Sequence, residues 1–217
     1  MERAEIIHLR TLINIMQFNQ EVRKIVRLFD EIQSYKPCNE QEDRDRKAML
    51  SYMETQANVL SRQNEIAHFT ASAWVLNREH SKVLMIYHNM YNSWSWTGGH
   101  ADNEEDLRAV AIRELKEETG VKYVKLLQEG VFSLEILVVE GHKKRGEYVP
   151  SHLHLNLTYL LEADESEELC VKPDENSGVR WFTPECAAAA SSEPWMRDRI
   201  YSKLNQKCEG IWNIIKL

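Results

Sequence analysis

The stretch "GGHADNEEDLRAVAIRELKEETGV", residues 98–121, decides how the chain should fold. Its second half reads as a helix that ends at Gly120, because glycine readily takes the left-handed conformation that closes a helix. Glu114, Glu117 and Glu118 follow the spacings i, i+3 and i+4, so their carboxylates share one face near that end. Each acid there is disfavoured by about 0.3–1 kcal/mol, because the helix dipole places partial negative charge at the C-terminus. The arrangement therefore predicts that something positive binds the three carboxylates.

A divalent ion is the simplest partner for this acidic face. Three convergent carboxylates form a hard-oxygen site suited to Mg²⁺ or Mn²⁺. Gly99 lets the backbone approach closely, so that its carbonyl oxygen could complete the coordination. We therefore interpret Gly99, Glu114, Glu117 and Glu118 as metal ligands. The alternative is a solvated, salt-bridged helix face, which the helix pattern alone does not exclude.

The spacing across the whole stretch is more specific than the acids alone. Gly98-Gly99 is followed after five residues by Glu105, and after seven more by the run that begins at Arg113 and ends at Val121. Every fixed position of the Nudix box is filled, and the chain resembles the Nudix hydrolase family. The resemblance implies a Mg²⁺-dependent (or Mn²⁺-dependent) hydrolase that cleaves the pyrophosphate bond of a nucleoside diphosphate linked to another moiety. Water attacks phosphorus in that chemistry, and metal ions screen the phosphate charge.

The resemblance also assigns catalytic roles outside the three carboxylates. It implies an ion pair between Glu105 and Arg113 that orients the acids; the alternative role for Glu105 is to partner a helix cap at Asp102. The catalytic base is one of the box acids or a residue on a separate loop. We take Glu175, in "KPDENSGVRWF", as the loop candidate, because the chain resembles family members that have an acid just ahead of this late strand. The alternative for Glu175 is an ordinary turn residue in a turn-rich segment.

Aromatic and histidine side chains near the box are candidates for substrate binding. Trp94 and Trp96 stand two apart in "YNSWSWTGG", where one could stack on a base, although core packing explains them equally well. His100 follows the glycine pair, while His152 and His154 share one face of a later strand. We predict that these histidines contact phosphate or water. Relatives resemble H-L-H-x-D at that strand, whereas this chain has Asn156, which removes a charge.

The hydrophobic pattern around the box predicts an α/β fold. Strands are expected over residues 68–77, 82–88, 93–97, 124–139, 152–161 and 179–182. Helices are expected over residues 102–119 and over most of 185–208. We predict a Nudix-like α/β/α sandwich with a mixed sheet as residues 63–217, preceded by an all-helical region at residues 1–62.

Composition limits the classes of partner and compartment. The chain has 217 residues, 43% hydrophobic and 28% charged, and a formal net charge of −7 that lies entirely beyond residue 62. This charge argues against binding to nucleic acid or to a membrane surface. The four cysteines show no C-x-x-C pair, and the sequence shows no signal peptide or membrane-spanning run, so we expect a cytoplasmic protein.

Two functional hypotheses remain open from the sequence. The first is an active pyrophosphohydrolase with a small-molecule nucleotide substrate. The second is a catalytically weak, Nudix-like module that senses or binds nucleotides, for which the helical residues 1–62 are the main argument. The apolar stripes of that region predict dimerisation or a cover over the substrate, and therefore a homodimer. The particular nucleoside diphosphate derivative does not follow from the sequence.

Overall fold

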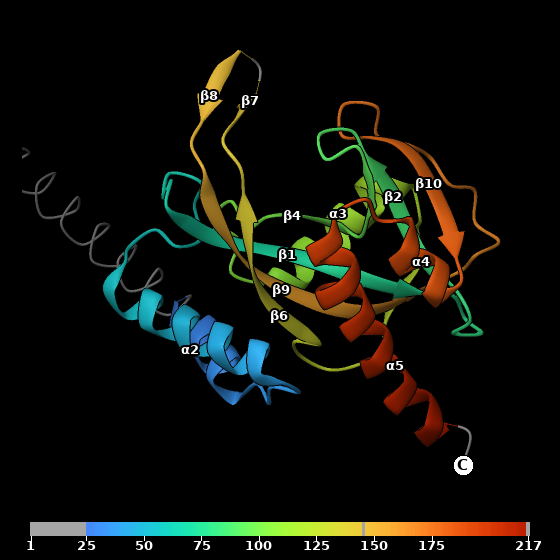
Figure 1. Ribbon diagram of the computed structural model, residues 1–217. Coiled ribbons are helices and arrows are strands. Elements are labelled where there is room, and N and C mark those ends of the chain that lie inside the picture. Colours follow the sequence, from blue (N-terminus) through green and yellow to red (C-terminus); the bar gives the residue numbers. More distant parts are fainter. Residues whose placement is uncertain (1–24, 145, 216–217) are drawn as a thin grey trace, which may run out of the picture.

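The computed structural model describes residues 25–144 and 146–215 (Figure 1). Residues 25–34 are helical, and α2 follows. The strands are β1 (Ala67–Leu76), β2 (Val83–His88), β3 (Ser93–Ser95), β4 (Thr97–His100), β5 (Val124–Leu126), β6 (Ser133–Val139), β7 (His142–Lys144), β8 (Glu147–Val149), β9 (His152–Ala163) and β10 (Asn176–Phe182). The helical elements are α2 (Glu40–Thr55), α3 (Leu107–Thr119), α4 (Pro184–Ala190), η1 (Met196–Tyr201) and α5 (Ser202–Ile215).

One mixed, eight-stranded sheet organises the domain. Its main path runs β10-β2-β1-β9-β5, while β3 pairs with β2, β4 with β1 and β6 with β9. The long central strands β1 and β9 are parallel, and the other pairs are antiparallel. The predicted mixed sheet is therefore confirmed, and its two parallel strands form the middle of the fold.

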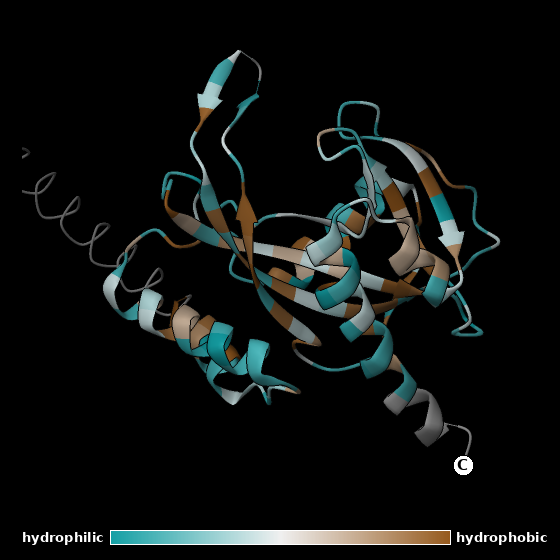
Figure 2. Cartoon of the chain, in the orientation of Figure 1, coloured by the Kyte–Doolittle hydropathy of each residue, from teal (hydrophilic) through white to brown (hydrophobic). Residues whose placement is uncertain are grey.

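Helices cover both faces of this sheet, as expected for an α/β/α sandwich. On one face, apolar residues of α2 and α3 pack against side chains such as Phe69 and Leu157. On the other face, α4, η1 and α5 pack against Trp74 and Leu160. Figure 2 shows hydrophobic residues concentrated along the central strands and polar residues on the outward side of α2. No helix of the described residues combines the length and hydrophobicity that a membrane crossing requires.

The helix that carries the box begins later than the sequence indicated. Asp106, and not Asp102, caps α3, and its side chain accepts the amide of Ala109 at 3.1 Å. Asp102 and Asn103 have φ values of 48° and 71°, a left-handed turn that cannot continue into a helix. Glu105 therefore precedes the cap, so its expected role as capping partner of Asp102 was wrong. The other end agrees with the sequence, since Gly120 closes α3 with φ of 78°.

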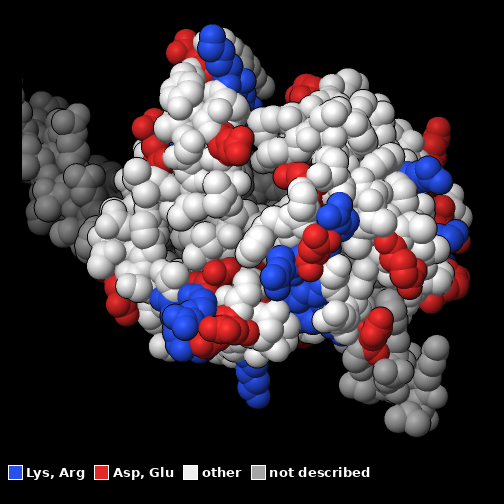
Figure 3. All heavy atoms as spheres, in the orientation of Figure 1, with Lys and Arg blue, Asp and Glu red and all other residues white. Residues whose placement is uncertain are grey.

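Two further expectations about strands were wrong. Residues 124–139 form two strands, because Gly130 turns the chain with φ of 73° between β5 and β6. Residues 140–152, where no strand was expected before residue 152, contain the antiparallel hairpin β7–β8. This hairpin projects from the domain (Figure 1), and basic and acidic side chains lie together at its tip (Figure 3), where Lys143, Lys144 and Glu147 are exposed.

Helix α2 packs along β6, a strand at the edge of the sheet. Asn39 caps α2 by accepting the amide of Glu42. The Gln41 side chain donates to the backbone carbonyl of Leu134 at 3.2 Å, and Asp45 accepts the amide of Ile136 at 3.0 Å. These bonds satisfy backbone groups of β6 that would otherwise attract another strand. The described part of the N-terminal helical region is thus packed on the same core as the sheet.

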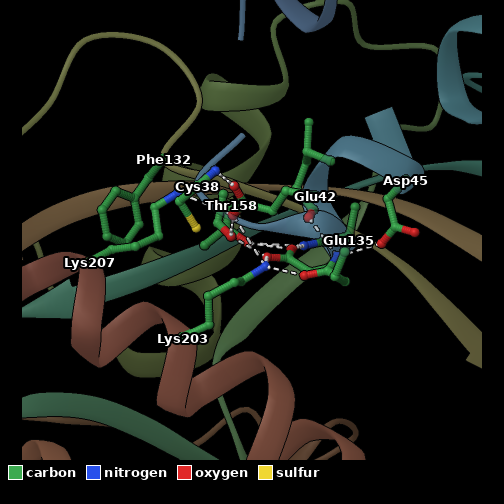
Figure 4. A network of polar contacts seen from close by, with 12 residues as sticks. Cys38, Glu42, Asp45, Phe132, Glu135, Thr158, Lys203 and Lys207 are labelled. Atoms are coloured by element: carbon green, nitrogen blue, oxygen red, sulfur yellow. Dashed lines mark hydrogen bonds and ion pairs between the residues drawn. The ribbon is translucent and has the colours of Figure 1, made fainter. Parts of the chain in front are cut away.

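A buried ion network joins α2, β6 and α5 (Figure 4). Glu42 and Glu135 are fully buried, and the ammonium of Lys203 lies 3.3 Å from the first and 2.9 Å from the second. Lys207 adds a second positive charge at 3.1 Å from Glu42, and the hydroxyl of Tyr35 donates to the same carboxylate at 2.7 Å. Buried charges persist only when they are paired, and here the two acids meet two lysines.

Candidate active site

The three box carboxylates lie where α3 meets the Gly98-Gly99 segment of β4. Glu118 is only 2% exposed and accepts the backbone amide of Gly98 at 3.0 Å. Gly99 lies directly against Glu114, since a Cβ added there would be 2.6 Å from the carboxylate carbon of Glu114. Any other residue at this position would displace Glu114. The close approach predicted for Gly99 is therefore a property of the fold.

The surroundings of Glu118 do not balance the negative charge of its ionised form. Burial raises the pKa of Glu118 to about 8; Glu114 and Glu175 add to this rise, while the Gly98 amide and Lys172 oppose it. A carboxyl group with such a pKa lacks the positive neighbours that usually accompany a buried acid. This deficit of positive charge is what a cation at the helix end would correct.

Arg113 is paired differently from the expectation. Its guanidinium lies 2.9 Å from the carboxylate of Glu114 and 3.9 Å from that of Glu117. Among the described residues these are its ion pairs, so the expected pair with Glu105 is not formed. The later start of α3 explains this, because Glu105 lies in the loop before the helix and not on the face that carries Arg113. Arg113 nonetheless holds two of the three box carboxylates.

Lys172 connects Glu175 to the box. Its ammonium lies 2.9 Å from the carboxylate of Glu175 and 3.1 Å from that of Glu117. Partial burial lowers the pKa of Lys172, but its bonds to these two acids outweigh that effect and raise it. The neighbouring Asn176 donates to the backbone carbonyl of Glu118 at 2.9 Å. The loop candidate Glu175 is thus brought to the acidic helix end, through a lysine that the sequence reasoning did not single out.

Four histidines converge on the sheet beside this segment. The ligand nitrogens of the four-histidine cluster all lie within 4.8 Å of one another; its members are His68, His100, His152 and His154. The sequence singled out three of them, and His68 of β1 was missed. The strand register explains the convergence. His68 pairs with His154, and Thr70, two residues further along β1, pairs with His100.

Three rings of the four-histidine cluster are held neutral. Burial, followed by nearby Arg62, lowers the pKa of His100 to about 3. Burial, followed by the ring of His100, lowers the pKa of His154 to about 2. Burial also lowers the pKa of His68. At neutral pH these imidazoles therefore present lone pairs and not positive charge.

The two tryptophans pack largely with the hydrophobic residues on the sheet face that α4, η1 and α5 cover. Trp96 is 7% exposed and meets the ring of Tyr201 edge-on at 5.5 Å. Trp94 is half-buried and lies between Tyr87 and Phe182, with ring centroids 5.5 Å and 4.9 Å away. Of the two, Trp94 keeps more surface for a ligand.

The family model for the NUDIX domain matches residues 67–203. This chain belongs to the NUDIX family. The match covers the sheet, the box helix α3 and most of the helical layer that ends in α5, so the NUDIX assignment concerns the domain as a whole and not the box alone.

Curated relatives agree with the NUDIX assignment. The chain is 32% identical over 126 residues to the human m7GpppN-mRNA hydrolase NUDT17, a match of 54% of this chain and 36% of that protein. It is 31% identical over 113 residues to the RNA pyrophosphohydrolase of Pelagibacter ubique, covering 50% of this chain and 71% of that protein. The match therefore spans about a third of the length of the human relative.

Solved structures show a weaker likeness. The C. elegans Ap4A hydrolase in a binary complex is 17% identical, with a TM-score of 0.49, covering 67% of this chain and 97% of that one. A NUDIX-family hydrolase from Clostridium perfringens is 22% identical, with a TM-score of 0.45, covering 64% and 97%. The NUDIX assignment rests on the family match and not on these likenesses.

The NUDIX acids of this chain fit a divalent hard cation. They supply several carboxylate oxygens, as Mg²⁺ prefers. The uncompensated charge of buried Glu118 and the close approach of Gly99 to Glu114 both favour an ion at this point. The arginine and lysine of the site contact Glu114, Glu117 and Glu175. The residues present are therefore consistent with a divalent cation at this point.

Proposed function

We propose that this NUDIX protein is a Mg²⁺-dependent pyrophosphohydrolase that cleaves a nucleoside diphosphate linked to another moiety. The observation that carries the proposal is the buried Glu118, which accepts the Gly98 amide at a helix end that also holds Glu114 and Glu117 and whose ionised form lacks a balancing positive charge. A chain that only bound nucleotides would gain nothing from this unfavourable grouping of acids. The alternative is a catalytically weak module that senses or binds nucleotides, which would have no need to keep every acid of the box.

The divalent ion would be held by Glu114, Glu117 and Glu118, with the Gly99 carbonyl as a further ligand. When bound, such an ion supplies charge stabilisation for the pyrophosphate and lowers the pKa of a bound water. Mn²⁺ would serve in the same way, since it accepts the same hard oxygen ligands. The number of ions is left open by the geometry.

The protein's own side chains would orient the reacting groups. Arg113 holds Glu114 in place through its 2.9 Å contact, so it acts as a positioning residue. Lys172 holds Glu175 at 2.9 Å, on the side of the acids where the β10 strand begins. We propose Glu175 as the group that accepts the proton of the attacking water, with one of the box acids as the alternative. Glu105 has no contact with Arg113 here, and its catalytic role stays a prediction.

The substrate is proposed to be a small-molecule nucleotide. Two relatives are named as an m7GpppN-mRNA hydrolase and an RNA pyrophosphohydrolase, and these names favour a substrate with linked phosphates on a nucleoside. Trp94, half-buried and packed on Phe182, is the better candidate of the two tryptophans to contact a base. Phosphate contacts by His100, His152 and His154 stay a prediction. The acidic net charge of −7 supports a substrate other than long nucleic acid.

Replacing Glu117 by Gln tests the proposal. The wild type, with Mg²⁺ and a panel of nucleotide sugars, dinucleoside polyphosphates and nucleoside triphosphates, should split at least one compound, identified by the masses of its products. Glu117→Gln should lower kcat by at least about a hundredfold, because one negative ligand is lost at a phosphoryl site. The control is Glu129→Gln, whose side chain is 90% exposed. Wild-type binding without turnover would favour the sensing module, and a fully active Glu117→Gln would remove Glu117 from the metal site.

We also propose that the protein forms a homodimer, although the described helices offer less apolar surface than the sequence indicated. Leu28, Ile32, Met49 and Met53 are buried within one chain, and residues 1–24 lie outside the described residues. Exposed Val26 and Ile66 are the apolar positions left near this region. Light scattering of the full chain decides the point, since a monomer would contradict it. The division of the chain into a helical region at residues 1–62 and a NUDIX domain at residues 63–217 stays a prediction.

A reducing compartment is proposed for the protein. The described cysteines are all free, and three of them, Cys38, Cys170 and Cys186, are exposed. Exposed thiols persist in the cytosol, where disulfides are kept reduced. One relative is named as mitochondrial, so the same chemistry is compatible with another reducing compartment.

A further inference from the structure

We propose that the four-histidine cluster binds one transition-metal ion of the Zn²⁺ class, separate from the carboxylate site. Imidazole nitrogens suit Zn²⁺ and its borderline neighbours, whereas Mg²⁺ and Mn²⁺ prefer carboxylate and carbonyl oxygens. The cluster contains no carboxylate, and the acidic helix end contains no histidine. Two sites of different ligand chemistry would therefore lie on consecutive stretches of the chain, since His100 directly follows Gly99.

The first observation is an unpartnered nitrogen in the interior. His68 is 3% exposed, and its Nδ1 lies 2.9 Å from the backbone carbonyl of Asn64. A carbonyl only accepts hydrogen bonds, so Nδ1 carries the proton of the neutral ring, and Nε2 is left with a lone pair. Nε2 is buried, and it has no hydrogen-bond partner among the residues that the structure describes. A buried polar atom of this kind is costly unless a ligand satisfies it.

The second observation is that His152 is held in the same way. Its Nδ1 lies 2.9 Å from the carbonyl of Pro150, so its Nε2 also presents a lone pair. Metal-binding histidines typically donate their other ring nitrogen to a backbone carbonyl or a carboxylate, which fixes the tautomer and the direction of the ring. Two rings of the cluster therefore already have the outer contacts that a metal ligand needs.

The third observation is the spacing of the nitrogens. Nε2 of His152 and Nε2 of His154 are 3.2 Å apart. Two ligands of a tetrahedral Zn²⁺, at about 2.0–2.1 Å from the ion, are separated by about 3.3 Å. All four ligand nitrogens lie within 4.8 Å of one another, so small ring movements would bring the set around one ion.

A metal-free arrangement is the competing explanation for part of this geometry. The ring of His154 could donate from Nε2 to Nε2 of His152, which would account for their 3.2 Å separation. It would leave the buried Nε2 of His68 without a partner. One ion satisfies both rings and His68 together, which is why the metal site is the better explanation. The ligands come from β1, β4 and β9, so the ion would join three strands.

Calorimetric titration of the full chain with Zn²⁺ tests the proposal. The protein is first freed of metal with a chelator and then held in millimolar Mg²⁺, which occupies the carboxylate site and leaves the histidines available. We expect one equivalent of Zn²⁺ to bind. His154→Gln and His100→Gln should each weaken that binding at least tenfold; both positions are only partly buried, which favours retention of the fold. Co²⁺ should also bind and give the intense visible absorption of four-coordinate cobalt.

Two matched variants locate the binding. His80→Gln changes a histidine that pairs with Glu162 outside the cluster, and Glu117→Gln changes the carboxylate site. Both should keep the wild-type affinity for Zn²⁺. The proposal is overturned if the wild type takes up no Zn²⁺ in Mg²⁺, if His154→Gln and His100→Gln bind as the wild type does, or if Glu117→Gln abolishes the binding. Circular dichroism of each variant confirms that the fold is retained.

Discussion

Two groups of glutamates in this protein are buried in contrasting surroundings. Glu42 and Glu135, between α2, β6 and α5, lie beside Lys203 and Lys207 and accept hydrogen bonds from neighbouring hydroxyl groups. Glu118 is buried to a similar extent at the end of α3, where its direct partner is a backbone amide.

The pKa values express this difference. Burial alone would raise the pKa of Glu42, but Lys203, the Cys38 amide and Tyr35 outweigh it and lower the pKa to about 2. Burial raises the pKa of Glu118 to about 8, because the positive charge near it is insufficient. The first group is complete within the chain and stabilises the fold. The second is incomplete, which is how a site for an external cation differs from a structural ion network.

Removing Lys203 from the network around Glu42 and Glu135 should produce the largest change in the free energy of unfolding. Lys203→Met would leave Glu42 and Glu135 buried with Lys207 alone, at a cost of about 3–5 kcal/mol. Chemical denaturation of the variant and the wild type measures this difference. Lys125→Met is the matched control, because that lysine is 70% exposed and lies 3.7 Å from Glu162. It should change the free energy of unfolding by less than about 0.5 kcal/mol.

A double-mutant cycle sharpens the same comparison. Glu42→Gln combined with Lys203→Met should cost less than the sum of the two single changes, because the double variant buries fewer unpaired charges. Strict additivity, or a loss below about 1 kcal/mol for Lys203→Met alone, would mean that the network is not a stabilising unit.

Metal should reverse the stability order at the incomplete group. In EDTA, Glu118→Gln should melt at the same temperature as the wild type or higher, since it removes a repelled charge. In Mg²⁺ the wild type should gain roughly 2.7 kcal/mol at a hundredfold excess over Kd, and the variant less. Four thermal melts measure this. Equal gains in both proteins, or no gain in either, would contradict a metal site at this helix end.

The stability of the metal-free protein should depend on pH, because Glu118 lacks sufficient positive charge nearby. The folded pKa of Glu118, about 8, lies above its ordinary value of 4.5, so folded protein binds more protons than unfolded protein between these values. The contribution of Glu118 is therefore fully present below pH 4.5 and is lost as the pH rises through about 8. In EDTA, the melting temperature of the wild type relative to Glu118→Gln should fall between pH 5 and pH 9. A pH-independent difference would contradict the raised pKa.

The smallest effect is expected from a glutamate that belongs to neither group. Glu40 begins α2 two residues before Glu42, but its side chain is 83% exposed and its partner Arg44 is 76% exposed. Glu40→Gln should change the free energy of unfolding by less than about 0.5 kcal/mol, because exposed ion pairs contribute little. Denaturation alongside Glu42→Gln measures the contrast between two acids of one helix. A large loss for Glu40→Gln would show that burial is not what separates the groups.

The sequence predicted those features that depend on local pattern. The box helix, its glycine end and the mixed sheet follow from hydrophobic period and glycine placement, and so does the approach of Gly99 to the acids. The start of α3 was not predicted correctly, because the left-handed turn at Asp102 and Asn103 has the same residue types as a helix cap. Local residue preference cannot decide between a cap and a turn that precedes one.

Contacts between distant segments could not be predicted in the same way. Lys172 lies 55 residues from Glu117 along the chain, and the two meet because the segment that leads into β10 contacts the end of α3, where Asn176 donates to the Glu118 carbonyl. His68 looked like the start of an apolar strand, and its partners become visible only once the β1–β9 register is known. Histidines that gather through strand pairing leave no local motif in the sequence.

The network around Glu42 has a consequence for the order in which the chain can fold. During synthesis α2 emerges first, but Lys207, which meets Glu42, is 165 residues further along. The edge strand β6 is also made before α5 supplies Lys203 to Glu135. Until α5 leaves the ribosome, the acidic side of α2 lacks its cations, so this part of the contact between α2 and the domain forms only after α5 has been made.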